Sequence, residues 1–133
     1  MIHSEPHDIL KFATMETKAF IKDYVRKNIV NRKVDFGNDA FKVKGFKVHQ
    51  AKHTIRRDEF DDYGVDPDTQ SFITIEFWDA ANEIDLNDCI AVILTINGKG
   101  LFGTASAPYD FDLDTVDDDW AIEFAEQLNK ANK

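Results

Sequence analysis

The segment from residue 116 onward constrains the fold most, because its apolar residues recur at four-residue steps. The stripe consists of Val116, Trp120, Phe124 and Leu128, flanked by Ala121 and Ala125. A stripe of this width on a 3.6-residue period predicts an amphipathic helix that covers a sheet. Thr115 or Asp114 is expected to cap this helix, and three aspartates follow in its first turn, where the helix dipole favours negative charge.

The N-terminal segment, about Pro6 to Asn31, predicts a second helix. Ser4 is expected to act as its N-cap. Apolar or small residues recur there at three- and four-residue steps, and lysines with Arg26 fill the opposite side. The recurring positions are Leu10, Ala13, Thr17, Phe20 and Tyr24, continued by an adjacent stripe of Ile21, Val25 and Ile29.

Between the two helices the period changes to the alternation of β-strands. Phe41 to Ile55 alternates but slips in phase at Gly45, which predicts one strand with a bulge at that glycine. Ser71 to Trp78 also predicts a strand, with Ile73, Ile75 and Phe77 on one face and Phe72, Thr74, Glu76 and Trp78 on the other. Cys89 to Ile96 is apolar on both faces and therefore predicts a central strand.

The dipeptide Asn97-Gly98 predicts a tight hairpin turn with positive φ at both central positions. Leu101 to Ala107 would then return as a short edge strand. The predicted fold is α+β, one domain over residues 1–133: an antiparallel three- to four-stranded sheet with a long N-terminal helix and a C-terminal helix. The element order is α-β-β-β-(β)-α, and both helices are expected on one face of the sheet.

Composition supports a packed core, since 43% of the residues are hydrophobic and eleven are Phe. Cys89 is the single cysteine, so no internal disulfide can form. The longest apolar run, Ile90 to Leu94, is far shorter than the roughly 20 residues of a membrane-spanning helix. No secretory signal pattern opens the sequence. We expect a cytoplasmic protein with no role at a membrane.

Charge is distributed very unevenly along the chain. Residues 1–57 hold 13 Lys/Arg and 6 Asp/Glu, whereas residues 58–133 hold 3 and 19, within a net charge of −9. Such asymmetry favours a charged partner, although opposite charges can also neutralise each other across neighbouring elements of one domain.

The acidic residues predict a partner-binding face, represented by Asp61, Asp62, Asp110, Asp112, Asp114 and Asp118. Three interpretations compete: solvated loops and helix caps, a surface that imitates nucleic-acid phosphates, and a divalent cation site. The last is disfavoured, because the run that begins at Asp110 has Thr115 and Ala121 where a calcium loop needs Gly and Glu. We predict no metal site.

The basic stretch from residue 42 to 57 predicts the alternative of nucleic-acid binding through a cationic strand. Its members are Lys42, Lys44, Lys47, Lys52, Arg56 and Arg57. A whole-chain charge of −9 and the absence of exposed stacking aromatics argue against this alternative.

No motif for catalysis or for a cofactor is present, so no catalytic residue and no cofactor is predicted. Glu76, a lone carboxylate in a largely apolar strand, is expected to face solvent. A small ligand-binding protein or enzyme, with a pocket between sheet and helices near Glu76 or Tyr109, remains a further alternative. The leading hypothesis is a non-catalytic interaction or regulatory protein, of a kind that a phage or mobile element could encode. It would bind a macromolecule, expected to be a protein, through a charged face.

Overall fold

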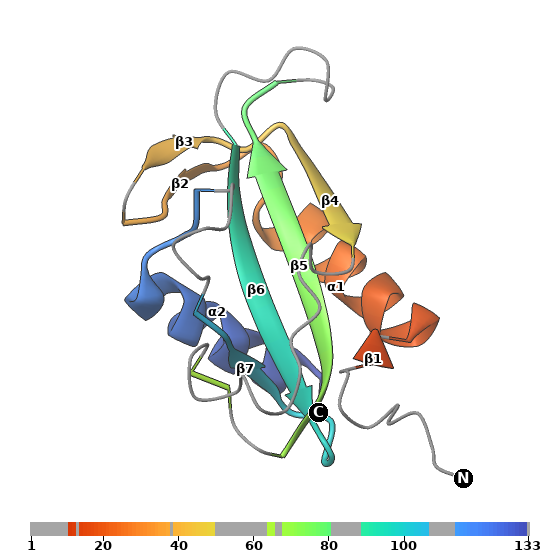
Figure 1. Ribbon diagram of the computed structural model, residues 1–133. Helices are drawn as coiled ribbons and strands as arrows, with labels where there is room; N and C mark the ends of the chain where they lie inside the picture. The colour runs from red at the N-terminus through yellow and green to blue at the C-terminus, as the bar shows by residue number, and fades with distance from the viewer. Residues whose placement is uncertain are drawn as a thin grey trace, which may run out of the picture.

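The computed structural model describes residues 11–12, 14–37, 39–49, 64–65, 68–80, 89–106 and 114–132. Two helices and seven strands lie in these segments (Figure 1). In chain order they are β1 (Lys11–Phe12), α1 (Met15–Asn28), β2 (Lys33–Asp35), β3 (Ala40–Lys42), β4 (Gly45–His49), β5 (Thr69–Trp78), β6 (Cys89–Asn97), β7 (Phe102–Thr104) and α2 (Asp118–Ala131).

Strands β5 and β6 form the centre of the main sheet. β4, β5, β6 and β7 pair antiparallel in that spatial order, and the two-residue β1 joins β5 in parallel at Ser71 and Phe72. β2 and β3 form a separate antiparallel hairpin. The predicted α+β class is confirmed, with one helix before and one after the main antiparallel strands, and β6 is central as expected.

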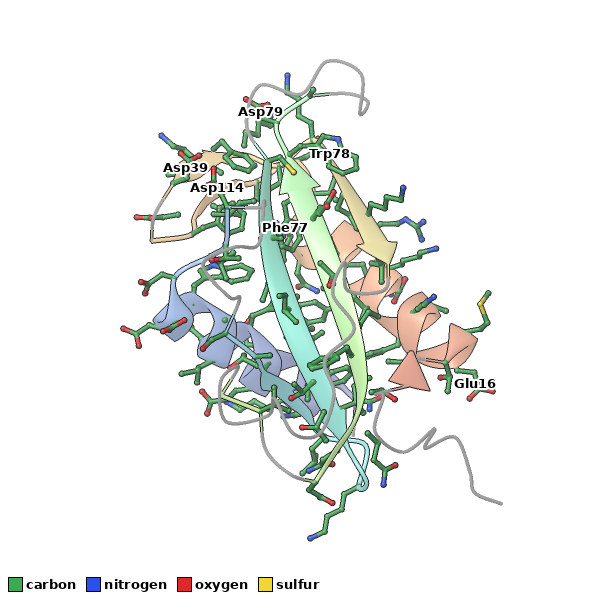
Figure 2. All side chains as sticks on the ribbon, in the orientation of Figure 1. Glu16, Asp39, Phe77, Trp78, Asp79 and Asp114 are labelled. Atoms are coloured by element: carbon green, nitrogen blue, oxygen red, sulfur yellow. The ribbon has the colours of Figure 1, made fainter. Side chains whose placement is uncertain are left out.

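The core lies between the main sheet and both helices. Ile73, Ile75 and Phe77 of β5 alternate on one face and are fully buried. α1 and α2 both pack on this face, as Figure 1 shows, which confirms the predicted arrangement. Figure 2 shows Phe77 inside this layer, whereas Glu16 of α1 projects outward. Full burial of each such side chain stabilises the fold by about 1.5–3 kcal/mol.

The turn of the β2–β3 hairpin fixes the start of α2. Phe36 is fully buried, and its ring centre lies 5.5 Å from that of Phe77 and 5.0 Å from that of Trp120. The backbone N–H of Asp117 donates to the Phe36 carbonyl at 2.8 Å. Gly37 has φ +95°, and a Cβ there would overlap the Cβ of Asp117. The hairpin and the helix start therefore fit together only with glycine at 37.

The N-cap of α2 is Asp117, whose carboxylate accepts the N–H of Asp119, so the prediction of Thr115 or Asp114 is wrong. The physical reason is that the preceding residues pair with β6. Ala91 donates to the Asp114 carbonyl at 2.8 Å, and Val116 donates to the Ala91 carbonyl at 2.9 Å. These bonds hold the chain extended until Asp117.

α1 begins later than predicted. Lys11 and Phe12 are extended in β1, Thr14 is the N-cap, and the helix starts at Met15. The Thr14 hydroxyl accepts the N–H of Thr17 at 3.1 Å, a local capping bond that favours this start. The expected cap at Ser4 lies outside the described residues.

The single strand predicted from Phe41 to Ile55 is wrong where the structure describes it, because β3 and β4 belong to different sheets. The phase slip at Gly45 marks the place where the chain passes from the hairpin to the main sheet. A Cβ on Gly45 would overlap the indole ring of Trp78, so glycine permits this close approach.

The hairpin between β6 and β7 is confirmed, but its turn differs from the predicted one. Neither Asn97 nor Gly98 adopts positive φ, whereas Gly100 does, at +80°. The Gly100 N–H donates to the Asn97 carbonyl and the Asn97 N–H donates to the Leu101 carbonyl, both at 3.0 Å. This is a three-residue loop with glycine in the left-handed position.

Comparing the stability losses caused by Gly37→Ala and Gly100→Ala distinguishes the cost of backbone strain from the cost of a clash with the start of α2. Both residues have positive φ, which costs a residue with a Cβ about 1–2 kcal/mol. Only at Gly37 does the Cβ meet another element, since nothing lies within 4 Å of one at Gly100. We expect Gly37→Ala to lower the free energy of unfolding by about 1–3 kcal/mol more than Gly100→Ala in urea titrations. Equal losses would show that the hairpin turn does not set the start of α2.

Candidate binding surface of helix α2

The outward side of α2 is acidic. The apolar stripe packs on the sheet, so the remaining side chains of the helix, most of them Asp or Glu in its first nine residues, face solvent. The helix buries Ala121, Phe124, Ala125 and Leu128. Its exposed residues between 118 and 126 form what we call the acidic α2 surface: Asp118, Asp119, Ile122, Glu123 and Glu126. Oxygen-tipped side chains project outward along α2 in Figure 2. Ile122 lies among the carboxylates with half of its surface exposed.

The charges of this surface repel one another. Residues 114–132 hold six Asp or Glu and one Lys, and that Lys130 lies in the last turn of the helix. Asp119 and Glu123 are four residues apart, a spacing at which like charges destabilise a helix by about 0.2–0.5 kcal/mol. A cationic partner would relieve this repulsion.

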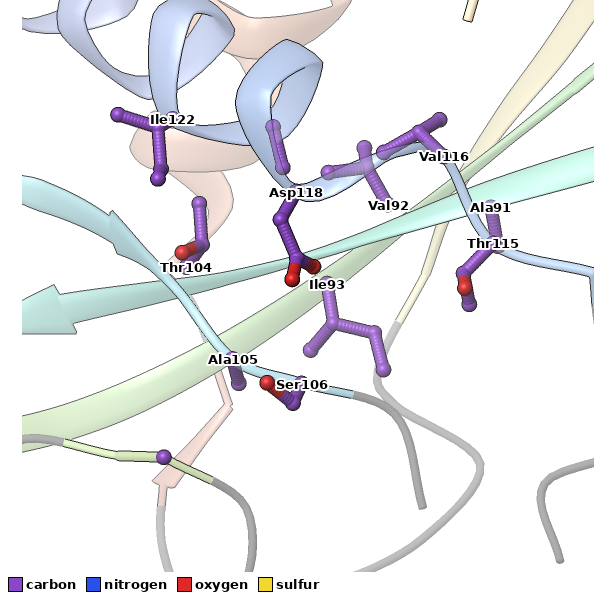
Figure 3. A pocket seen from close by; sticks show the side chains of 12 residues that line it. Ala91, Val92, Ile93, Thr104, Ala105, Ser106, Thr115, Val116, Asp118 and Ile122 are labelled. Carbon is purple, nitrogen blue, oxygen red and sulfur yellow. The ribbon is translucent and has the colours of Figure 1, made fainter. Parts of the chain in front are cut away.

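A cavity of about 190 Å³ opens on one flank of α2. The Asp118 carboxylate points into it from the helix, beside hydroxyls of Thr104, Ser106 and Thr115 (Figure 3). Carboxylate and hydroxyl oxygens together form a lining that accepts hydrogen bonds. The predicted site residue Asp118 therefore faces a hollow as well as solvent.

This cavity exists because two segments share one edge of β6. The segment after β7 is still bonded to β6 where Ala105 donates to the Ile93 carbonyl at 3.2 Å. At Ala91 the segment beside β6 is a different one: Thr115 forms a parallel β-bridge with Ala91. The cavity lies beside β6 between these two segments, and residues 104–106 and 115–116 both line it.

A second hollow of about 190 Å³, here called the interhelical groove, lies on the other flank, between α1 and α2. Aromatic and polar side chains line it together. They are Tyr24, Asn28, Ile29, Val34, Trp120, Glu123, Phe124 and Gln127. Each hollow beside α2 thus contains one carboxylate of the acidic α2 surface, Asp118 in the cavity and Glu123 in the groove.

A chain of hydrogen bonds crosses the groove. The Tyr24 hydroxyl donates to Gln127 Oε1 at 2.9 Å, and Gln127 Nε2 donates to Glu123 Oε1 at 3.4 Å. Asn28 Nδ2 donates to the Tyr24 carbonyl at 2.9 Å. Burial raises the pKa of the Tyr24 hydroxyl above its usual 10.0. These hydrogen bonds link side chains of α1 and α2 across the groove.

Of the predicted acidic residues, Asp118 belongs to the acidic α2 surface, whereas Asp114 is exposed in the segment that precedes the helix. Asp61, Asp62, Asp110 and Asp112 lie outside the described residues. Sequence reasoning did not single out Glu123 or Glu126. The sequence did contain a sign of their role: both lie off the apolar stripe, and this position places them on the outward side of the same helix.

The predicted basic residues are divided among separate elements. Lys42 lies on β3, Lys44 lies in the connection to β4, and Lys47 lies on β4, all exposed. The continuous cationic strand on which the nucleic-acid hypothesis depended is therefore not formed by these three. Lys52, Arg56 and Arg57 lie outside the described residues.

Glu76 lies on the face of the sheet opposite the helices, half-buried between the fully buried Thr74 and the buried Trp78. Lys47 of β4 is its cross-strand neighbour. Oppositely charged residues at such positions stabilise a sheet by about 0.2–1 kcal/mol, which gives Glu76 a structural role. Tyr109 lies outside the described residues.

Among the residues that the structure describes, no three His, Cys, Asp or Glu side chains are placed to hold a metal ion. In the same part of the chain, neither helix is long and apolar enough to cross a membrane. Comparison with protein-family models, with curated proteins and with solved structures finds no match for this chain.

The raised pKa of Tyr24 predicts a loss of stability in alkali. The unfolded chain ionises this tyrosine near pH 10, before the folded chain does, so its contribution is complete below pH 10 and is lost as pH rises through the folded pKa. Tyr24→Phe removes this effect and one hydrogen bond worth about 0.5 kcal/mol near solvent. We expect the urea midpoints of the two proteins to converge between pH 9 and about 11. A constant difference across this range would contradict the assignment, since the other tyrosines titrate in both proteins.

Proposed function

We propose that this chain is a non-catalytic interaction protein that binds a basic segment of another protein through the acidic α2 surface. The observation that carries the proposal is the placement of four exposed acidic residues on one helix, around the half-exposed Ile122. A cytoplasmic setting is part of the proposal and suits a chain with one cysteine.

Electrostatics supports a cationic partner. Residues 14–49 carry nine Lys/Arg and four Asp/Glu, whereas residues 114–132 carry one and six, so the charge signs are concentrated on different elements. A patch of one sign attracts an oppositely charged protein from a distance and orients its approach. Nucleic acid, which is anionic, would be repelled by this surface.

Shape supports a protein segment over a free cation. Ile122 offers apolar contact at the middle of the surface, and a hollow lies on each side of the helix. Partner side chains that enter such hollows are the usual carriers of binding energy in protein interfaces. The carboxylates Asp118 and Glu123 would meet cationic side chains there.

The replacement Glu126→Lys tests this function, with Glu16→Lys as its matched control. Both glutamates are exposed helix residues, but Glu16 lies at the start of α1. We expect zero-length cross-linking of carboxylates to amines, in extracts of cells that express the chain, to join α2 to a lysine-rich segment of one protein. Glu126→Lys should weaken purified binding of that protein about tenfold, because one attraction becomes a repulsion, and the loss should shrink at high salt.

Glu16→Lys should leave that affinity within about twofold. Equal weakening by the two replacements, or cross-links that avoid α2, would refute a binding role for the acidic α2 surface.

A further inference from the structure

We propose that the interhelical groove is a subsite for an arginine side chain of the bound partner. This inference rests on the proposed function and adds the identity of the anchoring residue. It is carried by the hydrogen-bonding state of the groove, by its aromatic walls and by the carboxylate of Glu123.

The polar groups in the groove are left mainly as acceptors. Tyr24 has donated its only hydroxyl proton to Gln127, so its oxygen can still accept. Gln127 and Asn28 each donate one amide N–H to a neighbour. Glu123 is a carboxylate, with more acceptor sites than the single N–H of Gln127 uses. A ligand that supplies several donors fits this lining better than one that needs donors.

The walls of the groove favour a flat cation. Tyr24 and Trp120 are half-buried and line the groove, and Trp120 stacks on Phe124 with ring centres 5.0 Å apart. Arginine combines five N–H donors in a plane with a weakly hydrated charge that packs on aromatic rings. A contact of this kind occurs within the protein itself, since the Arg26 guanidinium lies 5.9 Å from the centre of the Phe46 ring.

Lysine fits this groove less well. Its ammonium is compact and strongly hydrated, and it gains less from a flat aromatic wall. The cavity on the other flank of α2 provides the contrast inside one molecule: among the residues that the structure describes there, it has a carboxylate and hydroxyls and no aromatic side chain. Selectivity for arginine over lysine is therefore expected from the groove and not from the rest of the acidic α2 surface.

The test uses poly-arginine and poly-lysine peptides of equal length as probes, titrated calorimetrically into the full chain at low salt. Glu123→Gln removes the groove carboxylate, and Glu126→Gln makes the same chemical change on the same helix outside the groove. We expect the arginine peptide to bind the unmodified protein more tightly than the lysine peptide. Glu123→Gln should weaken the arginine peptide about tenfold, which matches the loss of one charge-assisted hydrogen bond. Glu126→Gln should weaken both peptides only about twofold.

A second readout separates binding in the groove from a general loss of charge. The indole N–H signal of Trp120, assigned with Trp120→Phe, should shift on addition of the arginine peptide and shift much less with the lysine peptide. Tyr24→Phe keeps the ring but removes an acceptor, so it should weaken the arginine peptide about threefold.

The outcomes distinguish the two proposals. Equal affinities for the two peptides, or equal effects of Glu123→Gln and Glu126→Gln, would overturn the arginine subsite while leaving the acidic α2 surface as a binding face. If neither peptide bound at low salt, both the arginine subsite and the binding role of the acidic α2 surface would be overturned.

Discussion

The pairing of β5 with β6 is the constraint on which the rest of the structure depends. The two strands pair along almost their whole length, from Thr69 opposite Asn97 to Trp78 opposite Cys89, and their side chains are buried on both faces. Because one face is filled by Ile73, Ile75 and Phe77, both helices must pack there to remove these side chains from water. The position of α2, and with it the direction in which its acidic side points, follows from this packing.

The aromatic residues convert this general packing into one specific arrangement. Phe36 comes from the hairpin, Phe77 from the sheet and Trp120 from α2, and their rings meet at centre distances of 5.0–6.0 Å. Contacts of this kind stabilise by about 0.5–1.5 kcal/mol each beyond the burial of area. The same Trp120 is half-buried and lines the interhelical groove, so the residues that hold α2 in place also form the wall of a candidate binding site.

Much of the fold could be predicted from the sequence, and the candidate site only in part. The stripe through Phe124 and Leu128 identified α2 because a helix buries residues four apart wherever it packs. The acidic character of the outward side followed from composition, and of the residues named in advance Asp118 belongs to it. The interhelical groove could not be foreseen, because Tyr24 and Gln127 are 103 positions apart and meet only through packing of two helices on one sheet.

What the sequence by itself determined is the class of each segment, since helical and strand periodicities are local and survive any arrangement of neighbours. Only the tertiary structure decided where the segments begin and which ones meet. At Gly45 the sequence shows a phase slip that fits either a bulge or a change of sheet. The indole of Trp78, 33 positions away, leaves room there only for a residue without a Cβ. Helix α2 begins only at Asp118, because hydrogen bonds from Ala91 and to Phe36 hold the preceding chain extended. Long-range contacts of this kind leave no periodic trace in the sequence, which is why they had to be found in the folded chain.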